Sequence, residues 1–285
     1  MIRSAADLQL RSLEDVVNLA SPRIKCKPRD VPLLRRLLNI CIRAAPSIVP
    51  PDPIMTTPVL SHPDLALSNL MVAPTGPAFV TSAINWQGAT ISPFPMQCGT
   101  PPALDYSQSL IKLPPDGSMP AWPHAFDAMS PEEQEIVRVH HRYACRLRLY
   151  TKTMARVDPL RALVSQLPHS YILEKLVTAI TRCIADGPLE LRGFLIDLQE
   201  MWSSIAESNC PCDFSPEEIA AHRAEDQAHQ EYTQNVEELC ARLGCQPDGA
   251  ISNDRYELAK VEMERHRTMW DEVDMKGPFP FYEGA

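Results

Sequence analysis

The abundance of proline restricts the fold of this chain more than any other feature. The sequence has 28 prolines but only 10 glycines in 285 residues. Proline fixes the backbone angle φ and has no amide hydrogen, which limits its positions in helices and sheets. The prolines follow no collagen-like period, so they predict short elements joined by stiff, extended connections. Hydrophobic residues make up 45% of the chain. We therefore expect a buried core in one large domain or two small ones.

The charge and the apolar runs argue against two classes of partner. The formal net charge is −9 at pH 7, which repels the phosphates that a non-specific nucleic-acid binder must neutralise. No apolar run approaches the roughly 18 residues that a membrane-spanning helix needs. Residues 1–20 mix basic and acidic side chains and lack an apolar segment, so no targeting signal is predicted there. We expect a cytoplasmic protein that binds neither nucleic acid nor membrane.

The nine cysteines do not form a recognisable metal or disulfide pattern. Cys210 and Cys212 lie too close together for the usual zinc-ligand spacing. Without a secretory signal, we expect reduced thiols, most of them buried as small hydrophobic side chains.

Helices are predicted over most of the C-terminal two thirds. Residues 130–133 and 215–218 both read Ser-Pro-Glu-Glu, which combines a capping serine, a first-turn proline and a capping-box glutamate. The second of these helices should stop near Gly244. We expect residues 130–273 to form a helical part of the protein. Another helix should follow Asp30 and end at Pro46.

One basic stretch in the first of these helices has two interpretations. Arg142 and Arg146 are four residues apart and share a helix side, and two histidines precede them at positions 140 and 141. The stretch, which also includes Arg148, is either an anion-binding patch or a solvated basic face, and we favour the solvated face.

Short apolar runs at 59–60, 70–72 and 78–81 predict strands, and the turn at 74–77 should connect the second run to the third. The predicted fold class is therefore mainly α with a small β patch, an α+β arrangement.

A loop between the first two predicted strands contains the pattern H-x-D-x-x-x-x-N, formed by His62, Asp64 and Asn69. Protein kinases use this spacing because the aspartate accepts the proton of the attacking hydroxyl and the asparagine reaches a magnesium ion on the phosphates. In the alternative interpretation, the side chains of Asp64 and Asn69 hydrogen-bond to their own backbone in a turn. We expect His62 to be a structural, hydrogen-bonded residue.

A second run, Ile84-Asn85-Trp86-Gln87, follows the third predicted strand. A carboxylate at such a position would normally bind the metal that bridges the phosphates. Trp86 is expected to pack as a core residue beneath this segment.

Gln97 and Leu104-Asp105-Tyr106 follow these two runs in the sequence. In this order, the runs resemble the aminoglycoside-phosphotransferase-like enzymes of the protein-kinase-like fold. The closest likeness is to their fungal branch, which includes the altered-inheritance-of-mitochondria phosphotransferase-like proteins. It covers most of the chain from about residue 31 onward.

The resemblance implies a kinase-like C-terminal lobe that uses ATP and Mg²⁺, with Asp64 as catalytic base and His62 bracing the loop. It implies Asn69 as a metal and cofactor ligand and places Asn85 at the position of the family's metal-binding aspartate. It also implies mitochondria as a second compartment.

The sequence departs from this family at two points. Asn85 offers only a neutral oxygen, which competes poorly with water for Mg²⁺. The first glycine of the chain is Gly76, so no glycine-rich phosphate loop precedes the His62 motif. We therefore expect the N-terminal nucleotide lobe to be missing. Residues 1–53 would be a helical inter-lobe remnant, and residues 54–285 would be the kinase-like C-terminal lobe.

Two functions follow as expectations. The first is a phosphotransferase-like protein whose ancestral reaction transfers the γ-phosphate of ATP to a hydroxyl of a small-molecule substrate, with little or no activity in this chain. The second is a non-catalytic, pseudokinase-type interaction module in which the helices of residues 215–273 contact a protein partner.

Overall fold

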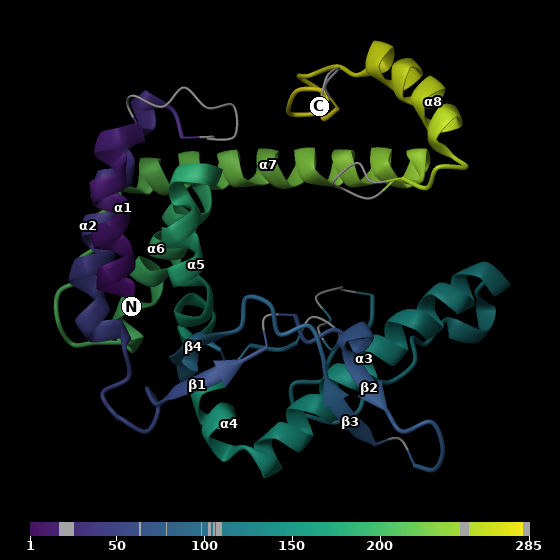
Figure 1. Ribbon diagram of the computed structural model, residues 1–285, viewed down its shortest axis with the longest axis horizontal. Coiled ribbons are helices and arrows are strands. Elements are labelled where there is room, and N and C mark those ends of the chain that lie inside the picture. Colours follow the sequence, from purple (N-terminus) through teal and green to yellow (C-terminus); the bar gives the residue numbers. More distant parts are fainter. Residues whose placement is uncertain are drawn as a thin grey trace. The chain divides into compact units, whose positions relative to one another are not determined.

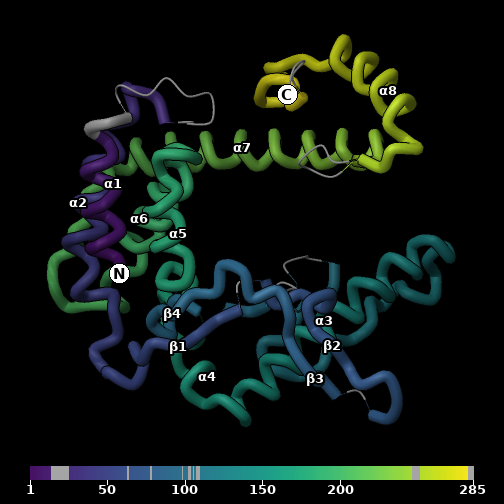
Figure 2. The backbone as a smooth tube through the Cα atoms, in the orientation of Figure 1, coloured from purple at the N-terminus to yellow at the C-terminus, as the bar shows by residue number. Residues whose placement is uncertain are grey.

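The computed structural model describes residues 1–16, 26–62, 64–77, 79–97, 99–101, 104, 106, 110–245 and 251–281, as traced in Figure 2. Pro63 and Asp105, which belong to the family pattern, lie outside these residues. The chain divides into two compact units, Met1–Cys212 and Asp213–Ala285. The predicted division between residues 53 and 54 falls inside the first unit and does not coincide with this boundary.

Four helices form the hydrophobic core of the first unit (Figure 1). They are α1 (Ile2–Val16), α2 (Val31–Ile48), α5 (Ser170–Asp186) and α6 (Leu189–Met201). Helix α1 contacts α2 and α5, and α6 contacts both α5 and α2. The inward side chains are fully buried, among them Leu13, Leu34, Leu37, Leu38, Ile172, Leu176, Leu191 and Leu195. Complete burial of large aliphatic side chains makes this the main source of hydrophobic stabilisation in the unit.

Helix α2 corrects one prediction. The helix was expected to end at Pro46, but it continues to Ile48, and Pro46 lies inside its last turn. The amide of Val49 still donates to the Ala45 carbonyl at 3.4 Å. A proline so close to a helix end removes only one hydrogen bond, and its fixed φ is compatible with the helix.

Two small antiparallel sheets, each of two strands, follow α2 along the chain. Strand β1 (Pro58–Ser61) pairs with β4 (Thr90–Pro93), and β2 (Leu70–Val72) pairs with β3 (Val80–Ala83). The connection from β2 to β3 turns at Gly76, whose φ of +86° suits glycine. The prediction of a mainly helical chain with a small β patch is confirmed. Strand β4 was not predicted.

The other helices complete both units. In the first unit they are α3 (Pro131–Val157) and α4 (Pro159–Ser165), and in the second they are α7 (Pro216–Leu243) and α8 (Tyr256–Met269). Short 3-10 turns occupy Pro28–Asp30, Leu67–Asn69, Phe94–Met96, Phe126–Ala128 and Trp202–Ser204.

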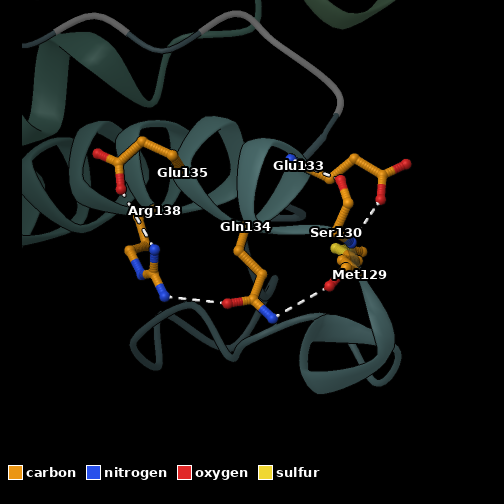
Figure 3. A network of polar contacts seen from close by, with 6 residues as sticks. All are labelled: Met129, Ser130, Glu133, Gln134, Glu135 and Arg138. Carbon is orange, nitrogen blue, oxygen red and sulfur yellow. Dashed lines mark hydrogen bonds and ion pairs between the residues drawn. The ribbon is translucent and has the colours of Figure 1, made fainter.

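The two Ser-Pro-Glu-Glu motifs begin helices as predicted. At the start of α3, the Ser130 hydroxyl accepts a hydrogen bond from the Glu133 amide at 3.3 Å, and the Glu133 carboxylate accepts from the Ser130 amide at 2.8 Å (Figure 3). Ser215 and Glu218 repeat this capping box at the start of α7. Helix α7 ends at Gly244, where φ is +68°. These starts and stops are local, which is why the sequence was sufficient to predict them.

In the second unit, the segment after α8 folds back onto α7. The Tyr232 hydroxyl donates to the Pro278 carbonyl at 3.1 Å, and the Asn235 amide donates to the Met275 carbonyl at 3.2 Å. The Trp270 indole donates to the Gly277 carbonyl at 2.9 Å. Side chains of α7 therefore hold the backbone of this segment in place.

Two sequence expectations concern membrane-spanning helices and the state of the cysteines. Among the described residues, no helix combines the length and the apolar character needed to span a bilayer. The described cysteines are free thiols. Five of them are buried, namely Cys26, Cys41, Cys183, Cys212 and Cys240.

Candidate functional site

The two sequence runs singled out above lie on neighbouring loops. One loop, residues 62–69, joins β1 to β2, and the other, residues 84–89, joins β3 to β4. The strand pairing matches Ser61 with Thr90 and Leu70 with Ala83. Both loops therefore leave from paired strand ends and must run beside each other.

Asp64 and Asn69 are in direct contact. The Asn69 side-chain amide donates to the Asp64 backbone carbonyl at 2.8 Å and to the carboxylate Oδ2 at 3.0 Å. Asn69 is buried, with 7% of its surface exposed, whereas Asp64 is exposed. A buried amide thus fixes both the backbone and one carboxylate oxygen of an exposed acid.

His62 joins the first loop to the second. Its Nε2 lies 2.7 Å from the Ile84 carbonyl oxygen, and its Nδ1 accepts the Asp64 backbone amide at 3.2 Å. This pattern assigns the hydrogen to Nε2 and leaves the lone pair on Nδ1. The Ile84 amide in turn donates to the Asn69 carbonyl at 2.9 Å. Both ring nitrogens of His62 are therefore hydrogen-bonded.

Trp86 is not the core residue that was expected. Its side chain is 46% exposed. The ring meets His62 edge-on at 4.7 Å between centroids, and the indole donates to the Ala83 carbonyl at 2.9 Å. Trp86 therefore covers one side of His62 from the surface.

Asn85 is exposed and has a left-handed backbone, with φ of +65°. Among non-glycine residues, asparagine and aspartate are the most tolerant of this conformation. Asn85 is brought to the site through its neighbour Ile84, which bonds to both His62 and Asn69. The structure thus joins His62, Asp64 and Asn69 by direct contacts and Asn85 by the backbone.

The donor set at these loops is a poor fit for a resident Mg²⁺ ion. It holds one carboxylate, from Asp64, and two neutral amides, from Asn69 and Asn85. Mg²⁺ favours anionic oxygen ligands, and only one of these three side chains carries a charge. Within the described ranges, no group of three or more His, Cys, Asp or Glu side chains could hold a metal ion.

A cavity of about 840 Å³ lies beside the first loop. Its wall includes His62, Leu65 and Trp86 from the two loops. Sequence reasoning missed the other lining residues, which include Tyr150 and Met154 from α3, Asp158 between α3 and α4, Arg161 from α4 and Glu174 from α5. A cavity of this size is within the range of small-molecule sites.

Arg161 and Glu174 give the cavity charges of both signs. Arg161 pairs with Asp158 at 3.5 Å and donates to the Gln97 carbonyl at 3.3 Å. The Glu174 carboxylate packs against Gly99, where any side chain would collide with it. The lining of the cavity therefore combines these charged side chains with the rings of His62 and Trp86.

Gln97 connects the cavity to the sheet that carries the first loop. Its side-chain amide donates to the Val59 carbonyl at 3.0 Å, to the Thr90 carbonyl at 3.3 Å and to the Ser92 hydroxyl. One amide thus holds β1 and β4 together behind the loop.

Comparison with known proteins identifies two curated relatives. Both are described as subtelomeric hrmA-associated cluster proteins, from two strains of Aspergillus fumigatus, and both are 31% identical to this chain over 238 residues. The match covers 80% of this chain and 46% of each relative. The chain thus spans about half the length of the curated relatives it matches. No protein-family model matches the chain, and no solved structure matches it.

Proposed function

We propose that this chain is an aminoglycoside-phosphotransferase-like protein and that residues 62–69 are the catalytic loop of a protein-kinase-like C-terminal lobe. The ancestral reaction is transfer of the γ-phosphate of ATP to a hydroxyl of a small molecule. The direct contact between Asp64 and Asn69 is the observation that carries this proposal. It gives the H-x-D-x-x-x-x-N spacing a defined geometry, and the bond from His62 to Ile84 ties that loop to the second run.

In this proposal Asp64 is the base that accepts the proton of the attacking hydroxyl. Its Oδ2 is held by Asn69, while the side chain as a whole is exposed. A carboxylate with a fixed orientation and solvent access is suited to receive such a proton. The adjacent cavity, whose wall includes His62 and Arg161, would hold the hydroxyl compound.

ATP and Mg²⁺ are the cofactors of the ancestral reaction, in which bound Mg·ATP supplies the phosphoryl group. The residues of this chain are poorly suited to hold them, because Asn85 lacks a charge and no glycine precedes Gly76. We therefore propose that the chain alone turns over little or no ATP, as in a pseudokinase.

Isothermal titration calorimetry with Mg·ATP tests this proposal. We expect no binding at micromolar concentrations for the natural chain and measurable strengthening in Asn85→Asp. Asn85→Gly is the matched control, because aspartate and glycine both tolerate the left-handed backbone but only aspartate adds a charge. Micromolar binding by the natural chain would contradict the inactive state, and equal affinities in both variants would contradict the placement of Asn85.

A second function rests on a different observation. Exposed large aliphatic side chains on helix α8 include Leu258 at 58%, Val261 at 70% and Met269 at 57%. Their spacing of three and eight residues places them on one helix side. This side supports the alternative of a non-catalytic module that binds a protein partner.

The two functions separate in one experiment. If the chain is a non-catalytic module, the full chain should cross-link to a specific partner in cell extract. The double variant Leu258→Ser, Val261→Ser should then lose that partner. The nearby exposed Glu257→Gln variant is the control and keeps that partner. A partner profile unchanged in the double variant would leave only the phosphotransferase-like function.

The cytoplasm and mitochondria are the two proposed compartments, the second by family resemblance alone. A fluorescent fusion at the C-terminus distinguishes them by co-localisation with a mitochondrial dye.

A further inference from the structure

Helix α3 carries a cysteine and a histidine in contact, away from the loops discussed above. Cys145 and His141 are four residues apart, and the Cys145 sulfur lies 3.6 Å from Nδ1 of His141. This spacing places the two side chains on one helix side. Both residues are half-buried, so the pair is not sealed in the core.

A backbone carbonyl fixes the proton of the imidazole. Nε2 of His141 lies 3.0 Å from the Pro120 carbonyl oxygen, which can only accept a hydrogen bond. The hydrogen of the neutral ring is therefore on Nε2, which leaves Nδ1, the nitrogen nearer the thiol, without a hydrogen. The distance from the sulfur to Nε2 is longer, at 3.9 Å. The arrangement is thus a thiol, a base and a group that orients the base.

An aromatic stack orients the ring of His141. Trp122 stacks on it with 3.8 Å between centroids and an angle of 10° between the planes. Together with the Pro120 carbonyl, the indole fixes the ring beside Cys145.

Charged side chains of both signs lie near this pair. Arg142 and Arg148 lie three residues before and after Cys145 on α3, which places them near its side of the helix. The facing segment, residues 110–129, carries Lys112, Asp116, His124 and Asp127. Asp116 interacts with Arg148 and Lys152.

The solvated basic face predicted for this stretch is therefore wrong at two positions. His141 is stacked and hydrogen-bonded, and Arg148 is half-buried and donates to the Pro114 carbonyl. Residues 114–122 cover this side of the helix and position the histidine.

Other cysteines of the same unit provide a contrast. Burial raises the pKa of Cys41 to about 12 and that of Cys183 to about 12. Such thiols stay protonated near neutral pH and are poor nucleophiles. Cys210 is half-buried like Cys145, but no imidazole contacts it in the part of the chain that the structure describes. It is the matched internal reference.

We propose that Cys145 is a peroxide-reactive thiol and that His141 is its base. Nδ1 of His141 takes the thiol proton, and the thiolate attacks one oxygen of hydrogen peroxide. An S–O bond forms as the O–O bond breaks, so the sulfur is oxidised by two electrons and the peroxide is reduced. The departing hydroxide takes the proton from the imidazolium, which leaves a sulfenic acid and water.

Metal binding is the weaker interpretation of this pair. Only two ligand atoms are present, and Nε2 of His141 is engaged with Pro120. In the described ranges, no third His, Cys, Asp or Glu side chain completes a metal-binding group here. Structural zinc sites require four ligands.

Peroxide labelling of the full chain tests the proposal. The protein is treated with limiting hydrogen peroxide in the presence of dimedone, and the sulfenic-acid adduct at each cysteine is quantified by peptide mass spectrometry. We expect the adduct at Cys145 to form at least ten times faster than at Cys210 at pH 7. Equal rates at the two cysteines would overturn the proposal.

The variant His141→Gln tests the base. Glutamine can still donate to the Pro120 carbonyl but cannot take a proton, so the helix and the covering segment should remain in place. We expect the Cys145 rate at pH 7 to fall about tenfold and the Cys210 rate to stay unchanged. An unchanged Cys145 rate, with circular dichroism showing an intact fold, would exclude His141 as the base.

A pH series distinguishes activation from simple exposure. The ratio of the Cys145 to the Cys210 alkylation rate by iodoacetamide should be greatest at pH 6 to 7. It should decline toward pH 9, where every accessible thiol ionises. A ratio independent of pH would show that exposure alone sets the rate and would overturn the proposal.

Discussion

The helical core and the β patch of the first unit, which we define as residues 58–93, are stabilised in different ways. In the core, Leu37, Leu176 and Leu195 have no exposed surface. In the β patch, Leu60 is 59% exposed and Ile91 is 69% exposed. Burial of apolar surface therefore accounts for the stability of the helices but contributes little in the patch.

The β patch is ordered by side-chain amides and an imidazole instead. Asn69 holds Asp64, His62 reaches Ile84, and Gln97 joins β1 to β4. These are directional contacts, each of which contributes modestly to the free energy of unfolding. The candidate site thus lies in a region that can be altered locally while the helical core remains folded.

The largest expected effect is on the core. Leu37→Ala removes a fully buried side chain from α2, and such truncations reduce the free energy of unfolding by about 2–5 kcal/mol. The matched variant Leu60→Ala, in an exposed position of β1, should change it by less than about 0.5 kcal/mol. Urea unfolding followed by circular dichroism measures both. Similar losses in the two variants would remove the contrast between the regions.

A smaller effect is expected at the site itself. Asn69→Ala removes both hydrogen bonds to Asp64, each of which contributes about 0.5–1.5 kcal/mol to the free energy of unfolding. Hydrogen exchange should increase in residues 62–72 and remain unchanged in α2. Faster exchange in both regions would mean that the patch and the core unfold together.

The helix caps should behave alike in the two units, because capping is local. Ser130→Ala and Ser215→Ala each remove a hydroxyl that accepts an amide hydrogen, at a cost of about 1 kcal/mol. Ser130→Asp and Ser215→Asp, which keep an acceptor, serve as controls. Thermal unfolding measures the four variants. Destabilisation by only one of the two alanine variants would show that the other unit compensates for its lost cap.

The smallest effect concerns pH and one buried histidine of the core. His169 lies 2.7 Å from the Ile48 carbonyl through Nε2, and burial lowers its pKa. Below a pH of about 6.5, this histidine therefore binds a proton more readily in the unfolded chain than in the folded chain. The free energy of unfolding should fall as the pH drops through this range. His169→Gln keeps a donor without titrating, and its unfolding free energy should depend less on pH. Equal pH dependence in the two proteins, measured by urea unfolding from pH 7.5 to 5, would assign the loss to other groups.

The sequence predicted features that depend on residues close together in the chain. It predicted the two capped helix starts at Ser130 and Ser215, because a capping box spans only four residues. It also predicted the short strands and the turn near Gly76. The spacing of His62, Asp64 and Asn69 correctly indicated a polar loop between two strands, since both bonds of Asn69 to Asp64 form within that loop.

Features that require distant segments were decided by the tertiary structure alone. Three features depend on segments far apart in the sequence. They are the pairing of β4 with β1, the exposure of Trp86, and the cavity wall at Arg161 and Glu174. The orientation of His141 likewise depends on a carbonyl 21 residues away. Local patterns fix local hydrogen bonds, whereas long-range contacts depend on how the whole chain packs, and a single sequence shows no direct trace of that packing.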